Sequence, residues 1–245
     1  MEETITKFAA EILDFKNYPN LIIFQNRKIQ EKLILIFITY CVIFLFIILS
    51  GLIISVTDFI VSHLLHFKNI YNQDTSQLKD EFAKFDHVKG ALVMCILGPL
   101  IEETIFRLPL SLNRYHIATA LSVAMLFFSG KIYTLQHIDW QFIMRLIFAL
   151  TLFLILMKWV PANLSQIDNK YKTIINISSI ALFGLVHITN FTPIQWSIWF
   201  IYPIYVLPQI CLGWGLTYIR FRNGFFWGLL LHCFINTISY VVTFL

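Results

Sequence analysis

The stretch GPLIEETIFR, residues 98–107, sets two carboxylates and one guanidinium inside an otherwise apolar run. On a helix, Glu103 and Arg107 are four residues apart and share a face, so their side chains can pair. Glu102 is rotated about 100° from Glu103 and has no partner within the stretch. An ionisable side chain at membrane depth costs roughly 2.5–3.5 kcal/mol on insertion scales, so such a residue is a candidate for function. The rest of the sequence must show whether this stretch lies in a membrane and what Glu102 faces.

The composition indicates a polytopic helical membrane protein. Hydrophobic residues make up 58% of the chain and charged residues 13%, against roughly 45–50% and 25% in soluble domains. Several apolar runs reach the ~20 residues that a helix needs to cross a ~30 Å hydrocarbon core. We expect an all-α transmembrane bundle, with a cytoplasmic segment at 1–32 and a single membrane-embedded domain at 33–245. About seven spans are predicted (about six to eight): Leu33–Val56, Val88–Leu112, His116–Leu135, Phe142–Val160, Thr173–Phe191, Ile194–Tyr218 and Gly224–Leu245.

The basic residues predict the orientation. With the N-terminus in the cytoplasm, the inner segments hold about eleven Lys and Arg residues and the outer segments about five, as the positive-inside rule requires. The basic residues form no single patch, so nucleic acid is not an expected partner. The short loops and the absence of transit features are typical of a bacterial protein, and we expect an integral protein of the bacterial plasma (inner) membrane.

Two further polar clusters lie within predicted spans. One is FGLVH, which ends at His187, and the other is HCFIN, in which His232 and Asn236 share a helix face. Together with Glu102, these residues lie roughly 13–22 Å from the cytoplasmic ends of their helices. Helix tilt can remove most of that spread. Three helices that are separate in sequence therefore place a carboxylate, two imidazoles and an amide in one buried layer.

This layer of side chains suits hydrolysis of a peptide bond by activated water. A carboxylate and an imidazole can take a proton from water, and a second imidazole and an amide can donate hydrogen bonds to the developing oxyanion. Glu102, His187 and His232 also form a possible ligand set for catalytic zinc. The sequence has no HExxH motif that would require a metal, so zinc and a metal-free site both stay open. It has no GxSxG motif for a serine nucleophile, and no pair of Asp residues falls within the predicted spans.

Other interpretations of these residues compete with catalysis. A lone intramembrane His is often a hydrogen-bonded packing residue, and Asn236 can join helices without any chemistry. The chain could be an inactive scaffold or immunity protein that binds a partner through its helices. It could also be a proton-coupled transporter in which Glu102 and the His residues relay protons, although no inverted repeat supports that function.

At these residues the chain resembles the family of CAAX prenyl proteases and bacteriocin-processing enzymes (CPBP), also called the Abi family of intramembrane peptidases. That family is marked by EExxxR, FxxxH and HxxxN on successive membrane helices. The three motifs stand here as EETIFR (102–107), FGLVH (183–187) and HCFIN (232–236). They are in order, each in a predicted span, and the resemblance covers about residues 90–245.

The resemblance implies an intramembrane endopeptidase, described in the family both as a glutamate-type and as a metal-dependent enzyme. Its substrate would be a peptide or protein that enters from the cytoplasmic side or from the bilayer, in peptide maturation or bacteriocin self-immunity. If a divalent metal such as zinc is present, its ligands would be Glu102, His187 and His232. The roles implied are water activation by Glu102 with His187, support by Glu103, Arg107 and Phe183, and oxyanion stabilisation by His232 and Asn236.

The sequence departs from the family pattern in two places. Leu108 and Pro109 follow Arg107 where a Gly after the Arg is usual, so we expect the helix beyond the motif to bend differently. The interval from Glu102 to His187 is also long, with two extra predicted spans where many members have one. Neither departure changes a proposed catalytic residue.

Overall fold

A computed structural model gives the fold of this chain. All regular elements in the residues that it describes are helices, so the predicted all-α class is confirmed. Most of the predicted cytoplasmic segment 1–32, and the end of the predicted third span after residue 130, lie outside the described residues. The described residues are 10–14, 28–71, 87–130, 139–162, 164 and 166–244.

Two of the helical rods contain a π-helical turn. The first rod is α2 followed by η2, and the second is α4, η3 and α5 in unbroken succession. The elements in chain order are α2 (Ile29–Phe59), η2 (Ile60–Leu64), α4 (His87–Leu92), η3 (Val93–Leu97), α5 (Gly98–Phe106), η4 (Leu108–Ser111), α6 (Arg114–Phe128), α7 (Trp140–Trp159), α8 (Asn169–Val186), η6 (His187–Phe191), η7 (Trp196–Ile201), α9 (Tyr202–Tyr205), α10 (Leu207–Asn223) and α11 (Phe225–Phe244).

Short polar side chains set where several helices begin. Asn113, Asp139 and Asp168 precede α6, α7 and α8, and each accepts a hydrogen bond from a backbone N–H two or three residues later, at 2.7–2.9 Å. Such caps satisfy donors that the first helical turn leaves without a partner. Gly224 separates α10 from α11 with a φ of 98°, a conformation that glycine adopts without steric cost.

Within the described residues, five helices are long and apolar enough to cross a membrane. The count of about seven spans is therefore not confirmed. The predicted span 88–112 contains nearly all of the rod formed by α4, η3 and α5, which has three charged side chains, and the described part of the predicted span 116–135 belongs to α6, which has only 15 residues. A 15-residue helix extends about 22 Å, less than the ~30 Å hydrocarbon core. The five are Ile29–Leu64, Trp140–Trp159, Asn169–Phe191, Trp196–Asn223 and Phe225–Phe244.

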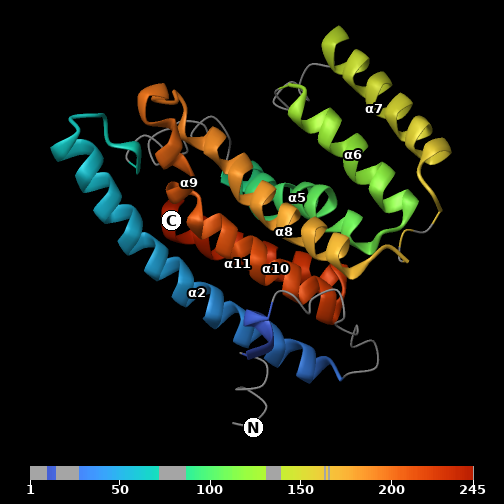
Figure 1. Ribbon diagram of the computed structural model, residues 1–245, viewed down its shortest axis with the longest axis horizontal. Coiled ribbons are helices and arrows are strands. Elements are labelled where there is room, and N and C mark those ends of the chain that lie inside the picture. The colour runs from blue at the N-terminus through green and yellow to red at the C-terminus, as the bar shows by residue number, and fades with distance from the viewer. Residues whose placement is uncertain are drawn as a thin grey trace.

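Helix α10 is the centre of the bundle. It contacts α2, α8 and α11, while α6 and α7 form a hairpin to one side that reaches the bundle through α5 (Figure 1). Two glycines allow the close helix approaches. A Cβ at Gly215 would lie 2.2 Å from Ile43 of α2, and one at Gly184 of α8 would lie 2.2 Å from Ile210. Small residues at helix crossings are the usual means of close packing in membranes.

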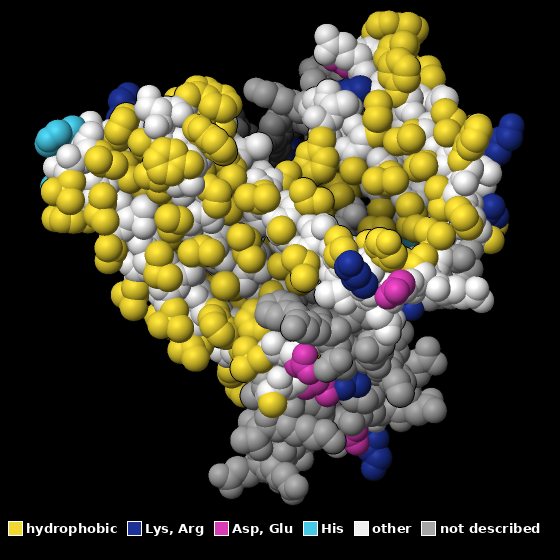
Figure 2. Space-filling view, in the orientation of Figure 1, with side chains coloured by type: hydrophobic (Ala, Val, Ile, Leu, Met, Phe, Trp, Pro, Cys, Tyr) yellow, Lys and Arg dark blue, Asp and Glu magenta, His cyan; other side chains and the backbone are white. Residues whose placement is uncertain are grey.

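The outer surface of the bundle is largely apolar. Figure 2 shows hydrophobic side chains over most of the visible face. On α7, Phe148, Leu150 and Leu154 are 52%, 57% and 68% exposed. A contiguous apolar surface of this extent marks an interaction site, and together with five helices of spanning length it indicates an integral membrane protein.

The described part of the N-terminal segment, residues 10–14, docks on α10. Ile12 is fully buried, and its carbonyl accepts a hydrogen bond from the indole N–H of Trp214 at 3.0 Å. The carboxylate of Glu11 accepts from the Tyr218 hydroxyl at 2.8 Å and pairs with Arg222. These contacts join the N-terminal segment to the central helix of the bundle.

A buried carboxylate holds the far end of α2. Asp58 accepts hydrogen bonds from the Tyr205 hydroxyl at 2.9 Å, from the backbone N–H of Ile70 at 3.2 Å and from the side chain of Asn69. The first predicted span ended at residue 56, so Asp58 fell outside it. Asp58 is fully engaged in joining the 65–71 segment to α9.

Candidate active site

The carboxylate of Glu102 lies between two imidazoles from different helices. Its Oε1 is 4.0 Å from Nε2 of His187, where α8 ends, and its Oε2 is 3.5 Å from Nε2 of His232 on α11. Glu102 and His187 keep partial exposure, with side chains 26% and 18% accessible, whereas His232 is buried. The structure therefore brings three of the four predicted catalytic residues together, with the carboxylate reachable from outside the protein.

The orientation of His187 follows from the end of α8. Its Nδ1 lies 2.7 Å from the carbonyl of Phe183, one turn earlier. A carbonyl can only accept, so Nδ1 carries a hydrogen, and in the neutral form of the ring the lone pair of Nε2 points toward Glu102. At 4.0 Å the lone pair and the carboxylate are too far apart for a direct hydrogen bond, and both are acceptors. A water that donates one hydrogen to each is the group that fits between them.

Glu103 orients the other imidazole. Its Oε1 lies 3.0 Å from Nδ1 of His232 and 3.4 Å from the guanidinium of Arg107. Glu103 and Arg107 are both fully buried, so the pair predicted from their spacing is present in the core. Consecutive carboxylates thus contact opposite nitrogens of one ring, with Glu103 at Nδ1 and Glu102 at Nε2.

Phe183 is the apolar centre of the site. The guanidinium of Arg107 lies 3.8 Å from its ring centroid, a cation–π distance. The His187 and His232 rings approach the same phenyl edge-on, with centroids 5.0 Å and 5.8 Å away. Gly213 of α10 makes room for this arrangement, because a Cβ there would lie 2.8 Å from Phe183 and 3.1 Å from Arg107. Phe183 therefore fixes both rings and the cation relative to one another.

Asn236 contacts the backbone of the helix that carries Glu102. Its Nδ2 donates to the carbonyl of Met94, within η3, at 3.0 Å. In this π-helical turn the N–H of Gly98 bonds five residues back, to Val93. With the same five-residue spacing, the carbonyl of Met94 would accept from residue 99. Residue 99 is a proline and has no N–H, so this carbonyl has no backbone donor. Asn236 supplies the missing donor.

The C-terminal end of the motif helix gives way to a 3-10 turn after Arg107. The α-helical turns of α5 end at Phe106, and a short 3-10 turn, η4, follows. The carbonyl of Phe106 accepts a hydrogen bond from the Ser179 hydroxyl of α8 at 2.5 Å. This bond holds the α5 end against the helix that carries His187.

Three residues of the site were not predicted from the sequence: Gly213, Met94 and Ser179. Pro99 could have indicated the role of Met94, because a proline within a helix leaves one carbonyl without its backbone donor. The sequence holds no comparable signal for Gly213 or Ser179, whose partners lie on other helices.

The described side chains include no group of three His, Cys, Asp or Glu residues that could hold a metal ion as they stand. In the ligand set proposed from the sequence, oxygens of Glu102 lie 4.0 Å from Nε2 of His187 and 3.5 Å from Nε2 of His232. Ligand atoms of a tetrahedral site with bonds of about 2.0–2.2 Å lie roughly 3.3–3.6 Å apart, so the His232 separation matches this spacing and the His187 separation is slightly longer. The mechanism proposed below uses the side chains alone.

Comparison of the chain with family models, with curated proteins and with solved structures finds no match. The resemblance to the CAAX prenyl protease family therefore rests on the three motifs and on their meeting in one buried layer.

Proposed function

We propose that this protein is an intramembrane endopeptidase of the CAAX protease-like type that hydrolyses a peptide bond with water activated by Glu102 and His187. The observation that carries the proposal is the pair of acceptors, a carboxylate oxygen and an imidazole lone pair, facing each other across 4.0 Å. With His187 neutral, a water that donates one hydrogen to each group satisfies both, and its oxygen keeps a lone pair for attack.

In the proposed reaction the water oxygen bonds to the peptide carbonyl carbon while Glu102 takes its proton. The carbonyl π-electrons move to oxygen and form a tetrahedral oxyanion. His232 donates from Nε2 to this oxygen, which requires the imidazolium form because Nδ1 already donates to Glu103. The oxyanion then re-forms the carbonyl, the carbon–nitrogen bond breaks, and the departing amine takes the proton from Glu102.

Asn236 has a narrower role than the resemblance implies. One N–H of its amide donates to the carbonyl of Met94. An amide has two N–H groups, so a contribution to the oxyanion would have to come from the second. We assign Asn236 first to holding the π-helical turn before Glu102, which sets the position of the carboxylate.

The proposed topology follows the charge distribution. We place the N-terminus in the cytoplasm of a bacterial cell and count α6 and the rod formed by α4, η3 and α5 as the remaining two of seven crossings. The substrate would be a peptide that reaches Glu102 from the cytoplasmic side or from the bilayer. The partial exposure of Glu102 supports such access.

The test is cleavage by the purified full-length chain in liposomes, with a peptide library and mass spectrometry of the new termini. We expect Glu102→Gln and His187→Ala to abolish cleavage while the protein stays folded and inserted. Asp58→Asn is the matched control, since it neutralises a buried carboxylate at the far end of α2. Full cleavage by folded Glu102→Gln protein would refute the proposal. A cellular protective effect that persists in this variant, with no cleavage by the wild type, would favour a scaffold or immunity protein.

A further inference from the structure

A second feature of the fold is an apolar cleft between the α6–α7 hairpin and α8, separate from the imidazole layer. Its volume is about 640 Å³. Figure 2 shows the surface hollowed between the hairpin and the rest of the bundle, with mostly hydrophobic side chains around the hollow. Residues that form its walls include Phe106, Pro109, Leu121, Phe128, Ile175 and Leu182.

Both long walls of the cleft begin with a cation. On α6, Arg114 is seven residues before Leu121, so it lies on the same helical stripe as the wall. On α8, Lys172 is three residues before Ile175 and Lys170 is four residues before Ile174, so both cations lie one turn before wall residues. The N-terminal ends of both apolar walls therefore carry positive charge.

The two charged ends lie at the same level of the bundle. The backbone N–H of Arg114 donates to the carbonyl of Ala162 at 3.4 Å, and that of Leu164 donates to Leu112 at 3.0 Å. These bonds tie the α7–α8 connection to the start of α6, and α6 and α8 begin at the same end of the molecule (Figure 1). Their N-termini add the positive ends of two helix dipoles.

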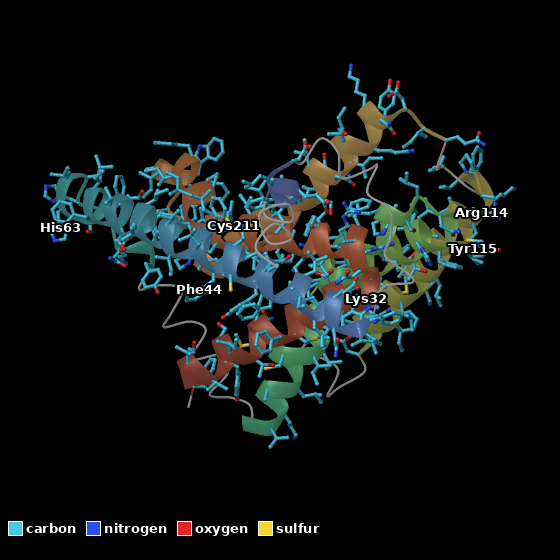
Figure 3. The ribbon with its side chains drawn as sticks, turned by 90° about the horizontal axis from the view of Figure 1, so that it is seen from below. Lys32, Phe44, His63, Arg114, Tyr115 and Cys211 are labelled. Atoms are coloured by element: carbon cyan, nitrogen blue, oxygen red, sulfur yellow. The ribbon has the colours of Figure 1, made fainter. Side chains whose placement is uncertain are left out.

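The guanidinium of Arg114 has an N–H group without a hydrogen-bond partner among the described residues. Its guanidinium lies 5.7 Å from the ring centre of Tyr115, and Figure 3 shows both residues at the edge of the molecule. Within the described part of the chain, its buried Nε has no hydrogen-bond partner. The nearest acid in sequence to Lys172 is Asp168, whose carboxylate caps its own helix through the N–H of Lys170.

We propose that the cleft binds an anionic glycerophospholipid, with one acyl chain between α6 and α8 and the phosphate at Arg114 and Lys172. The cleft opens among helices that face hydrocarbon, which supplies acyl chains, and the cations select the headgroup. Basic pockets between membrane helices are a known means of binding anionic headgroups. The bound lipid would fill the cleft between the α6–α7 hairpin and α8 and would stabilise the packing of α6 against α8. This inference does not depend on peptide hydrolysis.

The test uses delipidated full-length protein in detergent, with dioleoyl phosphatidylglycerol and dioleoyl phosphatidylcholine as probes and native mass spectrometry as the readout. We expect the wild type to retain the anionic lipid in preference to the zwitterionic one. Lys172→Gln and Arg114→Gln should each weaken phosphatidylglycerol retention about fivefold, as roughly 1 kcal/mol per basic residue implies. The matched control is Lys89→Gln, which makes the same charge change on α4, a helix that contributes no residue to the cleft lining.

A second pair of variants tests the acyl-chain part. Ser178→Phe fills the cleft and should reduce retention of both lipids, whereas Ile177→Phe, one residue earlier on an exposed face outside the cleft lining, should not. Equal retention of the two lipids by the wild type would overturn the proposal without any variant. So would a loss in Lys89→Gln as large as that in Lys172→Gln, or unchanged retention in Ser178→Phe.

Discussion

Oε1 of Glu103 lies 3.0 Å from Nδ1 of His232, while the neighbouring residue, Glu102, approaches Nε2 of the same ring at 3.5 Å. Two consecutive carboxylates therefore contact opposite nitrogens of one imidazole. Glu103 is fully buried and also pairs with Arg107, whereas Glu102 is partly exposed. The two acids have the same chemistry but different surroundings, and this difference separates their expected roles.

The first prediction compares Glu102→Gln with Glu103→Gln, the same change at adjacent positions. Glu102→Gln should lower cleavage by about 10²–10⁴-fold, the usual contribution of a general base, with little change in the free energy of unfolding. Glu103→Gln leaves the Arg107 charge buried without its partner and should lower the free energy of unfolding by about 3–5 kcal/mol. SDS titration in detergent measures the free energy of unfolding of each variant, and the liposome assay measures cleavage. Equal destabilisation by the two substitutions would contradict this division.

The second prediction concerns the space around Phe183. Gly213→Ala should lower the free energy of unfolding by about 1–3 kcal/mol, because the new methyl group would meet Phe183 and Arg107 at 2.8 Å and 3.1 Å. Gly51→Ala is the control, since nothing lies within 4 Å of a Cβ at that position in α2. There the better helix propensity of alanine should leave stability unchanged or slightly higher. A Gly213→Ala protein as stable as Gly51→Ala would exclude the close packing described.

The third prediction tests why Asn236 binds Met94. Asn236→Ala should cost about 1–3 kcal/mol, because it leaves a buried carbonyl without a donor. Pro99→Ala restores a backbone N–H to the helix, so the cost of Asn236→Ala should be smaller in that background. A double-mutant cycle of unfolding free energies measures this coupling. Strict additivity would show that Pro99 and Asn236 act independently.

The fourth prediction concerns the N-terminal segment. Ile12→Ala should lower the free energy of unfolding by about 2–5 kcal/mol, the range for truncating a buried aliphatic side chain, since Ile12 is fully buried. Leu13→Ala is the neighbouring control, because Leu13 is 55% exposed. The same SDS titration applies. Equal effects of the two substitutions would argue against docking of residues 10–14 on α10.

The amino-acid sequence alone determined the helical class and the membrane environment, because composition and apolar run length act without knowledge of contacts. Local spacing also predicted the Glu103–Arg107 pair, since residues four apart on a helix must share a face. The depth argument placed Glu102, His187 and His232 in one layer, and the structure brings an Nε2 of each imidazole within 4.0 Å of the Glu102 carboxylate.

Only the tertiary structure decided which nitrogen of each imidazole faces which acid, and that Asn236 binds a backbone carbonyl released by Pro99. It also decided that Gly213 makes room for Phe183 and that a cleft separates the α6–α7 hairpin from α8. These features depend on how helices distant in sequence rotate and approach. Helical periodicity fixes the faces of one helix, whereas the packing of side chains between helices fixes which faces meet.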